Sequence, residues 1–227
     1  MTKKSIYHKN YAENAYLMNY EKPHNSPYTS NQVYQFKIEL LDIFPTIWRR
    51  IWVPADYNFW DLHVAIQDAM GWTDSHLHHF EIKGKGKKTT AHIGMPDFYN
   101  TGELPEVFPG WEIPMFHFFN DLGVEAKYFY DYGDGWEHSV KLEGYIFREK
   151  KVKYPICIAG QSACPPEDCG GIHGYRNVIE TLSNPYHPDH RDMRIWVGED
   201  WDAEKFDQNK IRFDDPYKRW RHAFLES

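Results

Sequence analysis

The sequence predicts an α+β fold in a single domain, with a ββαβ beginning like that of β-grasp proteins, then a further β-hairpin and C-terminal helices. Hydrophobic and polar residues alternate from Val33 to Leu40, which is typical of a half-buried strand. Residues 46–53 are rich in β-branched and aromatic side chains and predict a second strand that pairs with the first. An apolar stripe at helical spacing follows over residues 59–70, and a third strand is predicted over 77–82.

The predicted helix has recognisable start and stop signals. Asn58 can cap its first turn, Asp61 is favourable there, and Gly71 can end the helix in the left-handed conformation. After the third strand, residues 83–114 contain several glycines and prolines, so we expect a long irregular surface loop.

The remaining elements follow in order along the chain. Residues 115–122 predict one short helix, and 126–146 predict the β-hairpin. A helix around Tyr175–Leu182 is expected to stop before Pro185, and another is expected shortly after Pro188.

Length and composition exclude several classes of protein. With 227 residues, the chain fits one domain at 31–227 preceded by a polar tail at 1–30, and we expect this tail to contribute little to the core. A net charge of −7 makes non-specific nucleic-acid binding unfavourable, because such binding needs clustered basic residues. No run approaches 18 apolar residues and no apolar segment follows the basic N-terminus, so we expect a cytoplasmic protein without a membrane span.

The hairpin yields the first candidate site. Asp134-Gly135 is a preferred pair for a two-residue type I′ loop, which would set Asp131 opposite His138 on the same face as Trp136. Such a pair is typical of a catalytic base or metal ligand in which a carboxylate orients an imidazole. It is equally typical of a buried polar pair whose members satisfy each other's hydrogen bonds.

The cysteines yield a second candidate site. All three, Cys157, Cys164 and Cys169, fall in one stretch with the spacing C-x6-C-x4-C, beside a Pro-Pro and a Gly-Gly pair. Such clustering favours a shared role as metal ligands or a redox pair, with inert buried thiols as the alternative. A zinc ion would need a fourth ligand, for which the candidates are His173, His138 and the pair His76/His78.

Two further groups could bind a ligand. His76 and His78 share one face of the predicted third strand, as a pair of metal ligands or as core residues would. Trp48-Arg49-Arg50 could stack on a base or clamp a phosphate, although neighbouring residues of a strand point to opposite faces. Asp134 and Trp136 of the hairpin complete the candidate binding residues.

Six motifs stand out along the chain: Pro45–Arg50, Val53–Asp56, Gln67–Trp72, Ser75–His78, Asp131–His138 and Cys164–Gly171. By these motifs, the chain resembles the plasmid pRiA4b ORF-3-like proteins from Val33 to about Phe213. The resemblance implies a stand-alone α+β cytoplasmic protein associated with plasmids and mobile elements, and it implies no settled activity. His79 and His173 stand where other residues are expected in this family.

The function favoured by the sequence is a binding or interaction module for a protein or small-molecule ligand. The first alternative is a metal-dependent hydrolase or nuclease that uses Asp131, His138 and the cysteine stretch. The second is a DNA-binding accessory protein of a mobile element. An enzyme should join Asp131, His138 and the histidine pair in an open pocket, whereas a binding module should bury them and expose aromatic residues.

Overall fold

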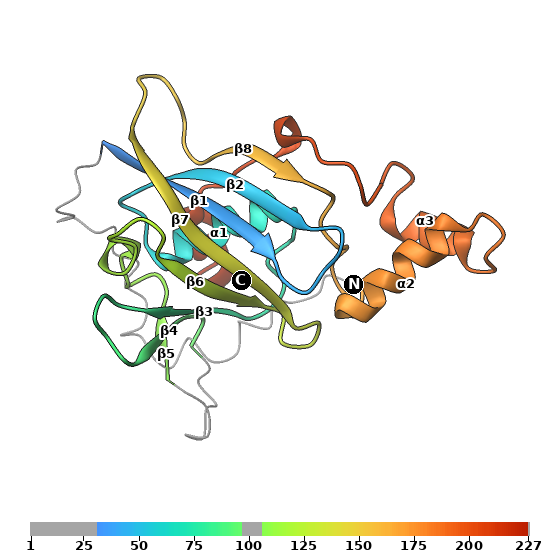
Figure 1. Cartoon of the computed structure of the whole chain (residues 1–227), viewed down its shortest axis with the longest axis horizontal. Helices are drawn as coiled ribbons and strands as arrows, with labels where there is room; N and C mark the ends of the chain where they lie inside the picture. Colours follow the sequence, from blue (N-terminus) through green and yellow to red (C-terminus); the bar gives the residue numbers. More distant parts are fainter. Residues whose placement is uncertain (1–30, 97–105, 227) are drawn as a thin grey trace.

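The protein is built on one twisted eight-stranded sheet, shown in Figure 1. The computed structural model describes residues 31–96 and 106–226, so the predicted tail at 1–30 lies outside the described residues. The strand order is β5-β4-β3-β6-β7-β1-β2-β8, and only the β4–β5 pair is parallel. The strands are β1 (Gln32–Leu40), β2 (Ile47–Pro54), β3 (His78–Lys83), β4 (Thr90–Gly94), β5 (Val107–Pro109), β6 (Glu125–Tyr130), β7 (Trp136–Phe147) and β8 (Ile156–Gln161).

Four α-helices occur in the described part of the chain. Helix α1 covers one face of the sheet, and α2 and α3 lie beside each other at one end of it (Figure 1). The helices are α1 (Phe59–Met70), α2 (Gly171–Ser183), α3 (His190–Val197) and α4 (Pro216–Phe224), with 3-10 turns η3 (Met115–His117) and η4 (Gln208–Lys210). The α+β class and the ββαβ beginning are thus confirmed, while the closer likeness to β-grasp proteins stays a prediction.

Helix α1 begins and ends where its local signals predict. The Asn58 side chain accepts a hydrogen bond from the Asp61 amide at 2.8 Å, and the Asp61 carboxylate accepts one from the Asn58 amide at 3.2 Å. Gly71 ends the helix with φ 89°, a conformation that glycine adopts without strain.

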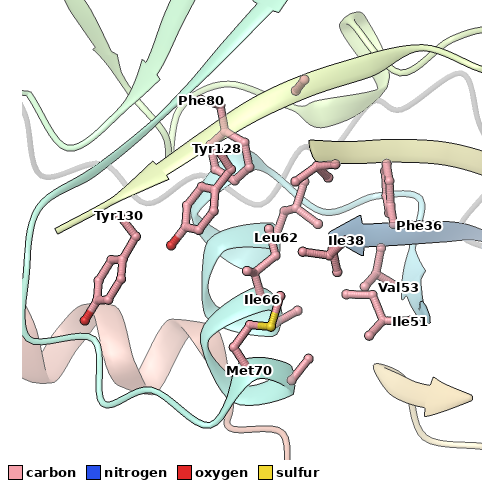
Figure 2. Packing of buried hydrophobic residues seen from close by; sticks show 14 of the residues in the cluster. Phe36, Ile38, Ile51, Val53, Leu62, Ile66, Met70, Phe80, Tyr128 and Tyr130 are labelled. Carbon is pink, nitrogen blue, oxygen red and sulfur yellow. The ribbon is translucent and has the colours of Figure 1, made fainter. Parts of the chain in front are cut away.

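The main core lies between α1 and the sheet, where Leu62, Ile66 and Met70 pack towards Phe36 and Ile38 (Figure 2). Each such side chain that leaves water stabilises the fold by about 1.5–3 kcal/mol. The opposite side of α1 is covered as well, by a second cluster that includes Trp220 and Phe224 of α4. Sequence reasoning did not resolve this last helix as a separate element, because its apolar residues are few.

Two stretches predicted as loops contain strands. Within 83–114, β4 pairs with β3 and β5 pairs with β4, while residues 97–105 lie outside the described residues. Gly94 allows this packing, because a Cβ there would lie 2.5 Å from the carbonyl oxygen of His78. Cys157 lies on β8 and pairs with Ile51 of β2, so the cysteine stretch is part strand and part loop.

The prediction of a two-residue turn in the β6–β7 hairpin is wrong. The turn spans five residues, Asp131 to Gly135, so that Tyr130 pairs with Trp136 and Tyr128 pairs with His138. Asp131 leaves the strand with φ 56°, and its carboxylate accepts a hydrogen bond from the Gly133 amide at 2.9 Å. Because this side chain stabilises the longer turn, Asp131 does not face His138 across the ladder.

Candidate functional site

The structure places the predicted catalytic histidine in the core. His138 is fully buried, and its Nδ1 lies 3.3 Å from the carbonyl oxygen of Tyr128. Its Nε2 has no hydrogen-bond partner among the described residues. Burial lowers the pKa of His138 to about 3, so the ring is neutral at neutral pH. The Asp131–His138 pair is therefore a wrong prediction, and His138 occupies the position of a core residue.

The predicted histidine pair is divided between two environments. His78 is fully buried and stacks on His63 of α1, with ring centroids 3.4 Å apart and an interplanar angle of 5°. His63 in turn contacts Asp74 through Nε2 at 2.7 Å and the Tyr128 hydroxyl through Nδ1 at 2.9 Å. Burial lowers the pKa of both histidines, so both rings are neutral at neutral pH.

His76 lies outside this core, before β3 begins, and it meets two carboxylates there. Its Nε2 lies 2.9 Å from Asp168 Oδ1 and 3.5 Å from Asp131 Oδ2. We call these three residues the junction site, because His76 precedes β3, Asp131 follows β6, and Asp168 belongs to the loop before α2. Asp131 is nearly buried whereas the Asp168 side chain is half exposed, so the site opens to solvent on the side of Asp168.

Strand pairing explains how two members of the junction site meet. In the antiparallel β3–β6 ladder, His78 pairs with Tyr130. The residues just before His78 therefore lie beside those just after Tyr130, and the Asp131 amide donates to the carbonyl oxygen of Leu77 at 3.0 Å. His76 and Asp131 are thus brought together by the register of the sheet.

The loop that carries Asp168 is fixed to the same place by its neighbours. Glu167 accepts hydrogen bonds from the Thr73 amide at 2.7 Å and from the Tyr130 hydroxyl. The Gly170 amide donates to the Asp134 carboxylate at 3.1 Å, and a Cβ at Gly171 would collide with the carbonyl oxygen of Asp134. Asp134 therefore stabilises the junction by holding the start of α2 against the hairpin turn.

Two of the junction residues have an uncommon backbone conformation. Asp131 and Asp168 have φ of 56° and 57°, in the left-handed region that Asp tolerates better than most residues. Such conformations persist only where the surroundings hold them, and they occur often at functional sites. Sequence reasoning identified the segment that contains Asp168 without singling out this residue, and it missed His63 and Asp74 because their partners are distant in sequence.

The cysteines do not form the predicted zinc site. All three thiols are free, and among the described residues no group of three or more potential ligands within 4.8 Å of one another includes a sulfur. Cys157 Sγ contacts the Ala159 carbonyl oxygen at 3.4 Å, and Cys169 Sγ contacts that of Gly171 at 3.8 Å. Burial raises the pKa of Cys169 to about 12 and also raises the pKa values of the other two, so all three remain thiols. His173 is exposed on α2.

The Trp48-Arg49-Arg50 segment does not form a joint clamp. Arg49 is buried, and its guanidinium donates to the carbonyl oxygens of Ala69 at 3.0 Å and Gln161 at 2.9 Å. The guanidinium carbon, Cζ, lies 4.0 Å from the ring centroid of Phe206. Arg50 points to the face of the sheet opposite α1, where it forms an ion pair with Glu143. Trp48 donates to the Gln161 side chain at 3.2 Å, and Trp136 is buried in the main core.

A cleft of about 780 Å³ lies away from the junction site. It is bordered by the start of α1, the segment before β8 and residues 208–217. Of the candidate site residues predicted from the sequence, only Cys157 lines it. In the described part of the chain, no helix is both long enough and apolar enough to cross a membrane.

This sheet, with its helix-covered face and its junction of hairpin turn and pre-α2 loop, defines an α+β protein with a mainly antiparallel sheet. The chain belongs to the plasmid pRiA4b ORF-3-like protein family, whose model matches residues 32–210. It is 35% identical over 192 residues to "Uncharacterized protein y4hQ" of Sinorhizobium fredii, covering 83% of this chain and 94% of that protein. It is also similar to the crystal structure of a protein of unknown function, MM3350 from Methanosarcina mazei Go1, with a TM-score of 0.72 and 38% identity over 82% of this chain and 100% of that one.

Proposed function

We propose that the protein is a binding module that holds a divalent cation at the junction site and uses it to recognise an oxygen-bearing, anionic ligand. The observation that carries the proposal is the approach of His76 Nε2 to two carboxylates, at 2.9 and 3.5 Å, from three segments distant in sequence. An imidazole with two carboxylates is a donor set that suits Mn²⁺, Zn²⁺ or Mg²⁺.

The surroundings of the site support a ligand role over a simple ion pair. The turn of Asp131 is held by its own hydrogen bonds, and the loop of Asp168 is anchored through Glu167 and Gly170. Residues held in this way are positioned before any ligand arrives, which lowers the cost of binding. The exposed side near Asp168 leaves coordination positions for water or for a ligand oxygen.

A binding role is favoured because Asp131 and His138, the two residues predicted to act as a hydrolytic pair, are separated. His138 and His78 are fully buried, whereas aromatic side chains remain exposed in the hairpin and on β7, at Tyr132 and Tyr145.

A metal-dependent hydrolase is the second candidate. In its favour, Asp131 does face an imidazole, that of His76, and a bound ion would lower the pKa of a coordinated water. A DNA-binding role has less support, since Arg49 is buried and Arg50 is ion-paired.

Calorimetric titration of the full chain with MnCl₂, ZnCl₂ and MgCl₂ tests the proposal. Asp168→Asn removes one ligand while keeping a residue that tolerates the left-handed backbone, and Asp200→Asn is the matched control at an exposed site elsewhere. We expect one bound ion to be lost in D168N and kept in D200N. We also expect inorganic phosphate to bind only when that ion is present.

Three results would overturn this proposal. Identical ion stoichiometry in the wild type and D168N would show that the junction is an ion pair alone. Phosphate binding that does not depend on the ion would remove the cation from ligand recognition. Ion-dependent hydrolysis of a nitrophenyl phosphate ester, lost in D168N, would establish the hydrolase in place of the binding module.

A further inference from the structure

We propose a second metal site, for Zn²⁺ or a similar transition-metal ion, on the face of the sheet opposite α1, at His79, Glu81 and His92. We call these three residues the strand site. They share no residue with the junction site, and the inference does not depend on the function proposed above. Neither the cysteines nor the histidines predicted as metal ligands belong to it.

Strand geometry brings the three side chains to one place. His79 and Glu81 are two residues apart on β3, so they point to the same face, and His92 of β4 pairs directly with Glu81. Glu81 Oε1 lies 3.7 Å from His79 Nε2 and 3.7 Å from His92 Nδ1. One donor atom from each of the three residues lies within 4.8 Å of the other two.

These distances fit a tetrahedral ion better than direct hydrogen bonds. Zinc bound to imidazole nitrogen and carboxylate oxygen at about 2.0–2.2 Å holds its ligand atoms about 3.3–3.5 Å apart. The two observed separations of 3.7 Å from Glu81 lie within a few tenths of an ångström of this value, and the two histidine nitrogens lie within 4.8 Å of each other. By contrast, 3.7 Å is long for an N–H···O hydrogen bond, which usually spans about 2.7–3.2 Å.

The neighbours of His79 orient its ring for coordination. Its Nδ1 lies 2.8 Å from the Tyr132 hydroxyl, and its ring stacks on Phe129 with centroids 4.6 Å apart and an interplanar angle of 6°. A proton on Nδ1 donated to Tyr132 leaves the lone pair of Nε2 facing Glu81, as in zinc sites where an outer hydrogen bond sets the histidine tautomer.

The coordination sphere is incomplete with protein ligands alone. Two histidines and one glutamate supply three ligands, which leaves the fourth tetrahedral position to water or to an exogenous ligand. All three side chains are partly exposed, and no described helix covers this face of the sheet in Figure 1. The strand site thus has the open geometry of catalytic or ligand-binding zinc centres.

Titration of the full chain with ZnCl₂ in the D168N background tests the strand site while the junction site is disabled. We expect one zinc ion to bind, His92→Ala to abolish the binding, and His173→Ala, which changes an exposed histidine on α2, to leave it unchanged. Tyr132→Phe keeps all three ligands and removes the outer hydrogen bond, so it should weaken binding about 10–100-fold. Cobalt in place of zinc should give the visible absorption of a tetrahedral ion, absent in H92A.

The outcomes separate this inference from the proposed function. Loss of zinc in H92A together with retention in D168N establishes the strand site, whatever happens at the junction. Absence of zinc binding in D168N, or equal loss in H92A and H173A, would overturn it. Equal affinity in Y132F and the parent would overturn the assigned role of Tyr132.

Discussion

The buried ring of His138 should make the protein sensitive to acid. Burial lowers the pKa of this histidine to about 3 in the folded protein, against about 6.5 in the unfolded chain. The unfolded chain therefore binds a proton below pH 6.5 that the folded protein does not bind, so stability falls as the pH falls through 6.5 and continues to fall until about pH 3. A pH of 5 lies roughly 1.5 units below the pKa of the histidine in the unfolded chain. Protonation of the unfolded chain therefore lowers the free energy of unfolding at pH 5 by about 2 kcal/mol.

Urea unfolding followed by tryptophan fluorescence at pH 7, 6 and 5 measures this effect. His138→Leu removes the titrating group with little change of volume, and we expect its loss of unfolding free energy between pH 7 and 5 to be about 2 kcal/mol smaller than that of the wild type. His63 and His78 titrate in both proteins and cancel in the comparison. His173→Gln, at an exposed position, should follow the wild-type profile, and parallel profiles for H138L and the wild type would refute the reasoning.

Two further predictions concern stability. Gly94→Ala places a Cβ 2.5 Å from the His78 carbonyl oxygen and should reduce the unfolding free energy by more than about 2 kcal/mol. The control Gly144→Ala, with no atom within 4 Å of the added Cβ, should change the unfolding free energy by less than about 1 kcal/mol. Arg49→Lys loses the fork of hydrogen bonds in a buried site and should cost about 2–4 kcal/mol, while Arg50→Ala on the exposed face should cost about 1 kcal/mol or less. Urea unfolding at pH 7 measures both pairs, and equal effects within either pair would contradict the assigned contacts.

Local signals predicted the elements from β1 to β3 well. The alternation in β1 and the capping residues of α1 act over a few neighbouring residues, so a short stretch of sequence is enough to predict this strand and the ends of this helix. β4 and β5 were missed because short strands among glycines and prolines have a weak pattern of their own. β4 is stabilised by pairing with β3, a contact that no local window contains.

The hairpin turn shows how one side chain can outweigh a favourable pair of turn residues. Asp134-Gly135 fits a two-residue loop, but the Asp131 carboxylate accepts hydrogen bonds from the amides of Gly133 and Asp134 and stabilises a five-residue turn. The ladder shifts accordingly, from Asp131 opposite His138 to Tyr128 opposite His138. A change of register moves side chains between the faces of a sheet, so this single error accounts for the misplaced catalytic pair.

The junction site could be predicted as a set of segments and not as a set of contacts. The motifs Ser75–His78, Asp131–His138 and Cys164–Gly171 were all identified from the sequence, and each supplies one member of the site. Their meeting depends on the β3–β6 register, which places the residues before His78 beside those after the end of β6, and on the hydrogen bond from Gly170 to Asp134. Both are long-range contacts. In the proposed cation site, His76 takes the place that the sequence predicted for His138, because the His76 side chain is partly exposed whereas His138 is fully buried.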